Sequence, residues 1–394
     1  LLRAYKTEIH PTEEQKKKIN QSIGVCRWLY NQYLAKNQEL YKQFKEDLIS
    51  KKEAMLSANN FDKYINNEVK VLEEYNWINL CGSKARKKAI CNAETAYKRF
   101  FTGKSKFPRL KKKNKSDVKL YFPKNNLTDW KIERHRINIP TLKWIRIKEF
   151  GYIPINSKVV SGTVSKKADR YFVSVIVEEK LTIENKSYTE GIGIDLGLKE
   201  FAVISNGIHK KNINKTANVK EIEKKLKREQ RKLSRKYESL KLRNKKEKGE
   251  ATRQNIQKQI VKVQRVHQRL SNIRTDYINK TINEIVKQKP SYITIEDLNV
   301  RGMIKNKHLS KAVAQQKFYE FRVKLEYKCK LNEIELRIVD RFYPSSKTCS
   351  CCGAYKKDLK LSDRIYKCSN CNASIDRDYN ASINLENAKI YEVA

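Results

Sequence analysis

The chain has 394 residues, and its 86 Lys and Arg against 44 Asp and Glu give a formal net charge of +42. This excess is spread along the whole chain, so it favours a polyanionic partner, above all nucleic acid, over a neutral one. No apolar run reaches the roughly 20 residues that span a bilayer, and the N-terminus reads as a strand rather than a signal peptide. We therefore expect a cytoplasmic protein with no membrane partner.

The first predicted elements are a short strand and a helical domain. Residues 3–9 alternate as a strand does, and Thr12 and Gln15 then have the spacing of a capping box that opens a helix. Apolar residues recur at three- and four-residue steps beyond it, which is typical of an amphipathic helix. Breaks in the helical pattern are expected near Asn59–Asn60 and at Cys81–Gly82.

A basic arm and a series of strands come next. Residues 102–116, TGKSKFPRLKKKNKS, have no apolar face and predict a loop. Four short runs with a period of two then follow, which are RINIP, WIRIKE, VVSGTVSK and RYFVSVIVEEK. Such runs with turns between them predict an antiparallel barrel or sandwich, which the N-terminal strand is expected to join.

The C-terminal half reads as an α/β unit with a mixed sheet. It begins with two strands and a hairpin signal at Asn206–Gly207. Residues 216–289 carry two apolar seams in a charged helical stretch, which predicts an antiparallel helical hairpin. Strands at 291–298 and 334–339 flank a helix expected at about 311–331.

Two Cys-x-x-Cys pairs near the C-terminus have the spacing of a four-cysteine zinc ribbon. The predicted ligands are Cys349, Cys352, Cys368 and Cys371. Four thiolates make a closed site, so this zinc would be structural rather than catalytic. Gly353 and Asn372 follow the pairs, where the turn needs residues that adopt a left-handed conformation at low cost. Cys351 would break the spacing and is discounted, and the remaining scattered cysteines suit a reducing cytosol.

Acidic residues stand where strands end and where the last helix begins. Asp195 ends a buried strand, Glu296 ends another, and Asp378 starts the helix. Unpaired carboxylates are costly at such places, and three that converge could hold Mg²⁺ through oxygen ligands and support phosphodiester cleavage. Each acid also has a structural alternative as a turn former or helix cap. The residues alone do not decide which acid of each neighbouring pair belongs to the metal site, Glu296 or Asp297 in one pair and Asp376 or Asp378 in the other.

Several motifs together resemble the TnpB family of transposon-encoded proteins, which are relatives of the compact type V CRISPR nucleases. They are GIDLG, IEDLN, SSKTCSCCG, CSNC and DRDYNAS, with the opening LRAYKTEIHPTEEQ and the basic KSKFPRLKKK. The resemblance implies an RNase H-like, RuvC-type active site with Asp195, Glu296 and Asp378 as catalytic, magnesium-binding acids. It also implies a guide RNA, a short motif read beside the double-stranded DNA target, and cleavage of both strands. The family commonly has Ala where this chain has Ser382, and Cys351 is an additional cysteine.

The sequence features and the family resemblance together imply a multidomain α+β protein. We expect it in the bacterial cytoplasm, associated with the nucleoid. The expected domains are a β-barrel wedge domain with the basic arm (1–10 and 102–189), a helical recognition domain (11–101), a RuvC-like nuclease domain (190–346 and 375–394) with a helical hairpin insertion (216–289), and a zinc ribbon (347–374). The role of the insertion stays open.

Two basic runs and one ribbon residue are the candidate nucleic-acid contacts. They are Lys84, Arg86, Lys87, Lys88, Lys104, Lys106, Phe107, Arg109, Lys111, Lys112, Lys113 and Arg364. The cations would neutralise phosphates and Phe107 would stack on a base, while the run at 83–89 would start a helix that meets duplex DNA. A solvated basic face is the alternative for each run.

The function these expectations favour is that of an RNA-guided, Mg²⁺-dependent DNA endonuclease in which base pairing reads the target. One alternative is a nuclease-inactive RNA-guided DNA-binding repressor, which would be expected to lack some of the acids. The other is a transposase that catalyses strand transfer, against which the lack of a separate end-binding domain argues.

Overall fold

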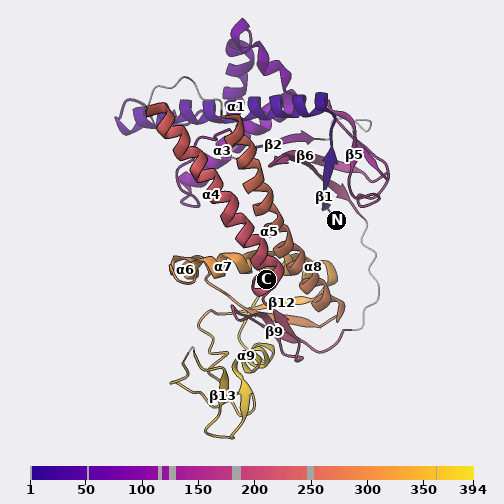
Figure 1. The fold of residues 1–394 in the computed structure, drawn as a ribbon, viewed down its shortest axis with the longest axis vertical. Coiled ribbons are helices and arrows are strands. Elements are labelled where there is room, and N and C mark those ends of the chain that lie inside the picture. The colour runs from indigo at the N-terminus through magenta and orange to yellow at the C-terminus, as the bar shows by residue number, and fades with distance from the viewer. Residues whose placement is uncertain are drawn as a thin grey trace. The chain divides into compact units, whose positions relative to one another are not determined.

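The structure is a computed structural model and describes residues 2–50, 53–113, 118–123, 130–179, 188–245, 253–360 and 362–394. The chain divides into two compact units, Leu1–Ile183 and Glu184–Ala394, each of which is described by itself (Figure 1). Among the described residues, none of the helices has both the length and the apolar surface to cross a membrane. The end of the predicted basic arm and the turn of the predicted helical hairpin lie outside the described residues.

The helical part of the first unit begins as predicted. Its elements are α1 (Glu13–Lys45), α2 (Ala58–Tyr64), a π-helix (Ile65–Val69), a 3-10 helix (Glu73–Leu80) and α3 (Ser83–Phe101). The capping box is confirmed, because the Thr12 hydroxyl accepts from the backbone N–H of Gln15 and the Gln15 side chain accepts from that of Thr12. The break expected near Asn59–Asn60 lies slightly earlier, between the end of α1 and Ala58, because Ser57 caps α2 by accepting from the N–H of Asn60.

The strands of the first unit form one antiparallel sheet. They are β1 (Leu2–His10), β2 (Lys119–Pro123), β3 (Lys131–Ile132), β4 (Arg136–Ile139), β5 (Lys143–Ile147), β6 (Val159–Lys167) and β7 (Arg170–Glu178), in the order β2-β6-β7-β1-β5-β4-β3. The N-terminal strand joins this sheet between β7 and β5, as predicted. Pairing among the described residues ends at β2 and β3, so the structure shows a sheet, and its closure into a barrel stays a prediction.

The second unit is built on a mixed sheet. Its strands are β8 (Ile192–Leu196), β9 (Glu200–Ile204), β10 (His209–Lys211), β11 (Tyr292–Glu296), β12 (Glu335–Val339) and β15 (Glu392–Val393), in the order β10-β9-β8-β11-β12-β15. β8, β11 and β12 run parallel, and the other pairings are antiparallel. The predicted hairpin turn is confirmed, with Gly207 at a φ of 85°. The carboxyl ends of β8 and β11 therefore meet at one edge of the sheet.

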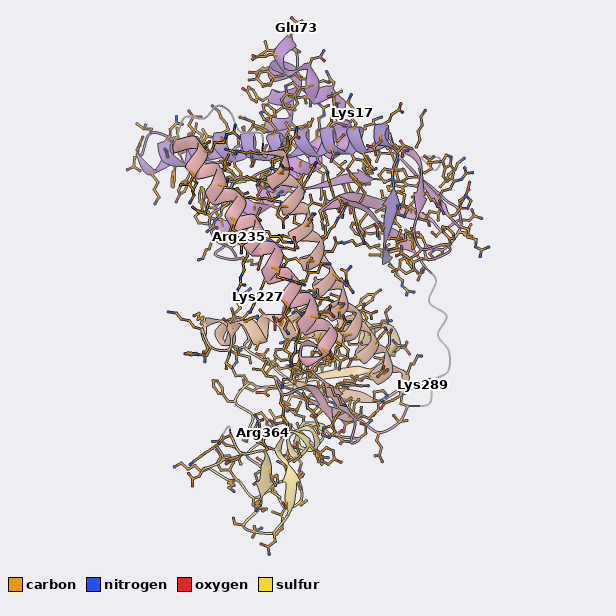
Figure 2. The ribbon with its side chains drawn as sticks, viewed as in Figure 1. Lys17, Glu73, Lys227, Arg235, Lys289 and Arg364 are labelled. Carbon is orange, nitrogen blue, oxygen red and sulfur yellow. The ribbon has the colours of Figure 1, made fainter. Side chains whose placement is uncertain are left out.

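Helices complete the second unit. They are α4 (Ala217–Lys245), α5 (Gln254–Lys287), α6 (Val300–Lys305), α7 (Ser310–Gln316), α8 (Phe318–Asn332) and α9 (Arg377–Glu386). α4 and α5 pack side by side through Val219, Ile222 and Leu270, as the predicted hairpin requires. Lys227 and Arg235 lie exposed on α4 (Figure 2). The single helix expected at 311–331 is wrong, because Lys317 adopts a left-handed conformation with a φ of 57° and separates α7 from α8.

Candidate active site and cysteine cluster

Asp195 and Glu296 share one face of the mixed sheet. Ile194 and Ile295 are partners in the parallel ladder between β8 and β11, and both pack into the core with α5 and α8. Successive side chains on a strand point to opposite faces, so the next residue on each strand points away from that core. The two carboxylates therefore project from adjacent strand ends toward the other face, where α9 packs.

A glycine lets α9 approach this face closely. A Cβ atom on Gly193 would lie 2.0 Å from the backbone oxygen of Ser382 and 2.4 Å from the backbone nitrogen of Glu386. Only glycine fits such a contact without a shift of the helix. Ser382 itself is buried, and its hydroxyl donates to the Tyr379 carbonyl at 2.7 Å, so the residue that departs from the family pattern is accommodated within α9.

The start of α9 distinguishes Asp376 from Asp378. The Asp376 carboxylate accepts from the backbone N–H groups of Asp378 at 2.9 Å and Tyr379 at 3.1 Å, which makes it the N-cap. The Asp378 side chain is therefore not needed as the cap. It receives a hydrogen bond from Arg377 at 3.2 Å and faces the cavity that Asp195 and Glu296 also line.

The end of β11 distinguishes Glu296 from Asp297 in the same way. Asp297 is paired with Arg322 and, at 2.7 Å, with Arg341. The hydrogen bond from Arg322 is the main cause that lowers the pKa of Asp297 below its usual range, although burial opposes it. Glu296 forms no ion pair with any residue in the described ranges, and its carboxylate lines the cavity.

While no cation is bound, the surroundings of this cavity disfavour the ionised form of its carboxyl groups. Burial raises the pKa of Asp195 to about 7, and the charges of Asp378 and Glu296 add to the effect. Burial also raises the pKa of Glu296 to about 7, with smaller contributions from Asp297 and Asp340. A bound divalent cation would offset both costs, because it favours the ionised form of each carboxylate.

The donor set of the three acids suits a hydrated cation. Within the described residues, the one group of three or more Cys, His, Asp or Glu side chains whose ligand atoms all lie within 4.8 Å of one another is formed by the four cysteines. Asp195, Glu296 and Asp378 all line the cavity. Mg²⁺ takes oxygen ligands and usually keeps several waters, with one or two carboxylates bound directly. The donor set of Asp195, Glu296 and Asp378 therefore fits this ion.

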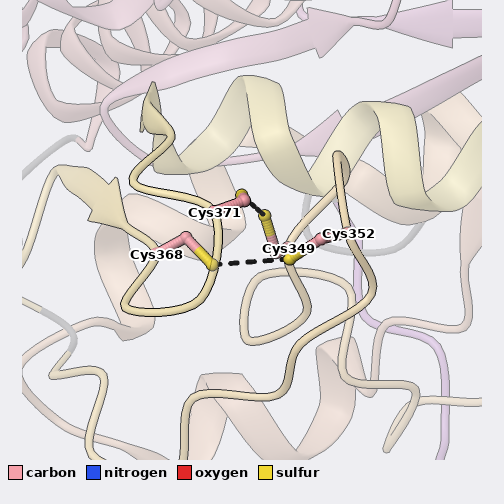
Figure 3. A group of neighbouring side chains, drawn as sticks. All are labelled: Cys349, Cys352, Cys368 and Cys371. Atoms are coloured by element: carbon pink, nitrogen blue, oxygen red, sulfur yellow. Dashed lines mark hydrogen bonds between the residues drawn. The ribbon is translucent and has the colours of Figure 1, made fainter.

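The cysteine pairs come together as predicted (Figure 3). The Sγ atoms of Cys349 and Cys371 lie 3.7 Å apart, and those of Cys352 and Cys368 lie 3.5 Å apart. A tetrahedral site with Zn–S bonds of about 2.3 Å requires S–S separations of about 3.8 Å. The four thiols therefore fit zinc, while Cys351 is exposed and stays outside the cluster.

The turns of the ribbon match the sequence prediction as well. Gly353 has a φ of 76° and Asn372 a φ of 56°. Two short strands in the ribbon, β13 (Ile365–Lys367) and β14 (Ser374–Asp376), pair with each other. The buried Tyr366 packs with Cys349 and Cys368, so a small core supports the cysteines.

Two asparagines on α9 are functional candidates that the sequence reasoning missed. The side chains of Asn380 and Asn384 are buried, and both donate to the backbone of the segment that carries the first cysteine. Asparagine is a poor helix former that favours caps and turns. Two of them four residues apart inside a helix, on one face, are the sequence signal that could have identified this contact.

The predicted nucleic-acid contacts divide into exposed and packed residues. The exposed ones are Lys84, Lys87, Lys88, Lys104, Lys106, Arg109, Lys112, Lys113 and Arg364. Arg364, which is labelled in Figure 2, also lines the cavity with the three acids.

Three of the predicted contacts do not lie on the exposed surface. Arg86 is 7% exposed and turned into the helical core, so it does not belong to the basic face. Phe107 packs against Tyr97 and Phe100, with ring centroids 5.6 and 5.0 Å apart, so its stacking role is not supported. Lys111 is half-buried, with its ammonium 3.8 Å from the centre of the Tyr30 ring. Tertiary packing buries Arg86 and partly covers Phe107 and Lys111, and the role of these residues as nucleic-acid contacts stays a prediction.

Comparisons with known proteins agree with this architecture. The family descriptions "Helix-turn-helix domain", "Probable transposase" and "Cas12f1-like, TNB domain" match residues 1–46, 172–307 and 318–385. The fold is similar to that in a cryo-EM structure of a Cas12f1–sgRNA–target DNA complex, with a TM-score of 0.57 and 14% identity over 100% of this chain and 99% of that one.

Two curated relatives extend over nearly the whole chain. A protein of Streptomyces pristinaespiralis is 30% identical over 385 residues, which cover 97% of this chain and 88% of the relative. A protein of Escherichia coli K12 is 28% identical over 404 residues, which cover 98% and 91%. Both are named "Putative RNA-guided DNA endonuclease". The chain belongs to the TnpB (OrfB, IS605) family.

Proposed function

We propose that this protein is an RNA-guided DNA endonuclease that cleaves phosphodiester bonds by a metal-dependent, RuvC-type mechanism. The observation that carries the proposal is the convergence of Asp195, Glu296 and Asp378 from β8, β11 and α9 on one cavity. Buried carboxylates with a raised pKa at the edge of a sheet are typical of a functional site. The names of the relatives support the reaction class.

In this proposal the three carboxylates hold Mg²⁺ and act as the catalytic residues. Magnesium supplies, when bound, the positive charge that stabilises developing negative charge at the phosphate. Asp195 and Glu296 are fixed by adjacent strands, so their separation is set by the ladder. Arg377 donates to Asp378 and restrains its side chain at the start of α9. Asp376 contributes the helix cap instead of a ligand.

The cysteine cluster has a structural role in this proposal. Four thiolates leave no open position for substrate, so zinc would hold the ribbon together without taking part in the reaction. The ribbon leads directly into α9, because β14 ends at Asp376 and the helix begins at Arg377. Zinc would therefore order the segment that delivers Asp378 to the cavity.

The partners in this proposal are a guide RNA and a double-stranded DNA target. The net charge of +42 and the exposed lysines and arginines of α3 and the basic arm support a polyanionic partner. In RNA-guided enzymes the protein contacts mostly the backbone of the heteroduplex, and base pairing reads the sequence. We assign the helical part of the first unit to recognition and its sheet, as a barrel, to a wedge role.

A plasmid cleavage assay tests this function. The protein is purified with the RNA that accompanies it, that RNA is sequenced, and a plasmid with the matching target is incubated with Mg²⁺. The wild type is expected to cut both strands, and Asp195→Ala is expected to bind RNA and target without cutting. Asp276→Ala is a matched control, since this exposed acid lies on α5 and pairs with Lys280.

The other outcomes of this assay separate the alternatives. Target binding by the wild type without cleavage would indicate a repressor. Strand joining that needs no guide would indicate a transposase. Full cleavage by Asp195→Ala would exclude the proposed site.

A further inference from the structure

An aromatic ring stands exposed beside the acids. Phe342 is 85% exposed, the highest value among the large hydrophobic side chains in the described part of the chain. It lines the same cavity as Asp195, Glu296 and Asp378. Burial of a Phe ring is a large favourable contribution to folding, so a ring left in solvent at a cavity of this kind indicates a ligand.

The backbone around Phe342 is held in place from one side. The Asp340 carboxylate accepts from the N–H of Phe342 at 2.8 Å, and the Asp340 carbonyl accepts from the N–H of Tyr343 at 3.0 Å. The turn therefore has a fixed shape. Arg341, the residue before the ring, is paired with Asp297 at 2.7 Å, which ties the turn to the end of β11.

The residue after Phe342 anchors the turn from the other side. Tyr343 packs against Val339 and Leu385, and its hydroxyl donates to the Asn384 carbonyl at 3.1 Å. Both neighbours of Phe342 are thus bound to the nuclease fold while its own ring faces solvent. With the backbone fixed in this way, only the two side-chain torsions of Phe342 remain to be ordered when a flat partner binds to its ring.

The rest of the cavity lining suits a nucleic-acid strand. A second exposed ring, Tyr355 of the ribbon, lines it with 58% exposure. Five basic side chains line it as well, which are Lys199, Arg341, Lys347, Arg364 and Arg377. A basic groove with aromatic faces is the arrangement that binds single strands, in which phosphates meet cations and bases stack on rings. In a duplex the base faces are already stacked on one another, so an unpaired strand is the better fit.

We propose that Phe342 is a stacking platform for a base of the single DNA strand whose phosphodiester lies at the three acids. The inference rests on the proposed function for the identity of the strand as DNA, and it adds a specific contact to that site. Phe342 would fix the position of the strand along the cavity, with Tyr355 as a second face. Phe342 takes the stacking role that the sequence suggested for Phe107, whose ring packs against Tyr97 and Phe100.

Photo-crosslinking tests the contact without any need for cleavage. The probe is an oligothymidylate with one iododeoxyuridine, added without Mg²⁺ to the protein in complex with its RNA. After irradiation the crosslinked peptide is identified by mass spectrometry. We expect crosslinks at Phe342 that are lost in Phe342→Leu and kept in Phe342→Trp. The matched control Phe150→Leu, an exposed Phe of the first unit, is expected to leave them unchanged. Crosslinks that avoid residues 340–347 would overturn the proposal.

A cleavage experiment with abasic targets gives the second test. An abasic site is moved one position at a time along the cut strand. At one position, loss of the base is expected to slow wild-type cleavage about tenfold, and Phe342→Leu is expected to slow cleavage of the intact target to the same extent. The two changes together should cost no more than either alone, because each removes the same contact. Fully additive losses at every position would contradict the stacking role.

The two experiments keep the proposals separate. Crosslinking at Phe342 by a protein that does not cleave would retain the platform and refute the nuclease. Cleavage with additive losses and no crosslink at Phe342 would refute the platform and retain the nuclease.

Discussion

Asn380 holds the backbone of Thr348, the residue before the first cysteine of the cluster, by a hydrogen bond of 2.7 Å from its side-chain amide to the Thr348 carbonyl. Its amide oxygen accepts from the N–H of Ser350 at 2.9 Å. Asn384, one turn further along α9, donates to the same Thr348 carbonyl at 2.7 Å. The loop that carries Cys349 is therefore bound to the helix that carries Asp378, two residues before Asn380.

This contact predicts that Asn380 positions the active site through the ribbon. Asn380→Ala leaves the partly buried N–H of Ser350 without this partner, which is expected to cost about 1 kcal/mol of stability. Cleavage should fall several-fold, and the Mg²⁺ concentration for half-maximal cleavage should rise, while RNA binding stays unchanged. Asn387→Ala is the control, because Asn387 is exposed just after α9 and its side chain donates to the Ile383 carbonyl of the same helix. Equal Mg²⁺ dependence in both variants would show that Asn380 has no positioning role.

Loss of zinc is expected to act through the same connection. In the Cys368→Ser/Cys371→Ser variant the ribbon cannot close, so Asp378 is no longer held at the cavity. Zinc content and cleavage should fall together while guide RNA stays bound. Cys351→Ser, which changes a thiol outside the cluster, should retain both. Normal cleavage by the double variant would refute the coupling between ribbon and active site.

The close approach of α9 to β8 predicts a strong effect at Gly193. A methyl group there would meet backbone atoms of α9 at 2.0 and 2.4 Å, and backbone cannot move aside as a flexible side chain can. Gly193→Ala is expected to cost about 1–3 kcal/mol and to reduce cleavage by displacing Asp378 from Asp195. Thermal unfolding and cleavage rate measure the two effects.

A matched glycine separates this clash from a general effect of the substitution. Gly24 lies in α1 with open space around its Cβ position. Gly24→Ala should be neutral or stabilising by up to about 1 kcal/mol, because Ala favours helix. A Gly193→Ala variant that is as stable and active as Gly24→Ala would contradict the packing described for α9.

The raised pKa values of Asp195 and Glu296, both about 7, predict a pH-dependent stability. These folded values lie above the unfolded values of about 4. The stability contribution of each carboxyl is therefore fully present below about pH 4 and is lost as the pH rises through about 7. Without Mg²⁺ at about pH 8, Asp195→Asn should unfold at a temperature a few °C above that of the wild type, and the difference should vanish near pH 4.

Added Mg²⁺ provides the control for this prediction. At about pH 8 it should stabilise the wild type more than Asp195→Asn, because it binds the ionised carboxylates. At limiting Mg²⁺ the cleavage rate should rise with pH through about 7, since protons and the cation compete for the same oxygens. If the wild type and Asp195→Asn unfold at the same temperature at high pH, with and without Mg²⁺, then ionisation of Asp195 does not destabilise the fold.

Features with a local cause were predictable from the sequence. The capping box of Thr12 and Gln15 depends on residues three apart, and the left-handed turns at Gly353 and Asn372 depend on single residues. The cysteine cluster followed from spacing within one short segment. The mixed sheet followed from buried runs of five or so residues, which have few alternatives in an α/β unit.

Features that depend on distant contacts were not predictable in the same way. The carboxylate of Asp376 reaches the N–H groups at the start of α9, and that of Asp378 is left to face the cavity. Neither composition nor spacing could predict which of the two would cap the helix. Phe107 stands in a basic loop, yet neighbouring rings cover it. The exposure of Phe342 depends on anchors from β11 and α9 that are far from it in the chain. These contacts, rather than motifs, separate the residues that face the cavity from those that do not.

The most direct test of the account compares target cleavage by Asp378→Asn and Asp376→Asn under identical conditions. Asparagine caps a helix about as well as aspartate, so Asp376→Asn is expected to keep the fold of α9 and to cleave within about tenfold of the wild type. Asp378→Asn removes a charged ligand and is expected to abolish cleavage while RNA and target stay bound. Cleavage that survives in Asp378→Asn and disappears in Asp376→Asn would contradict the assignment of the active site.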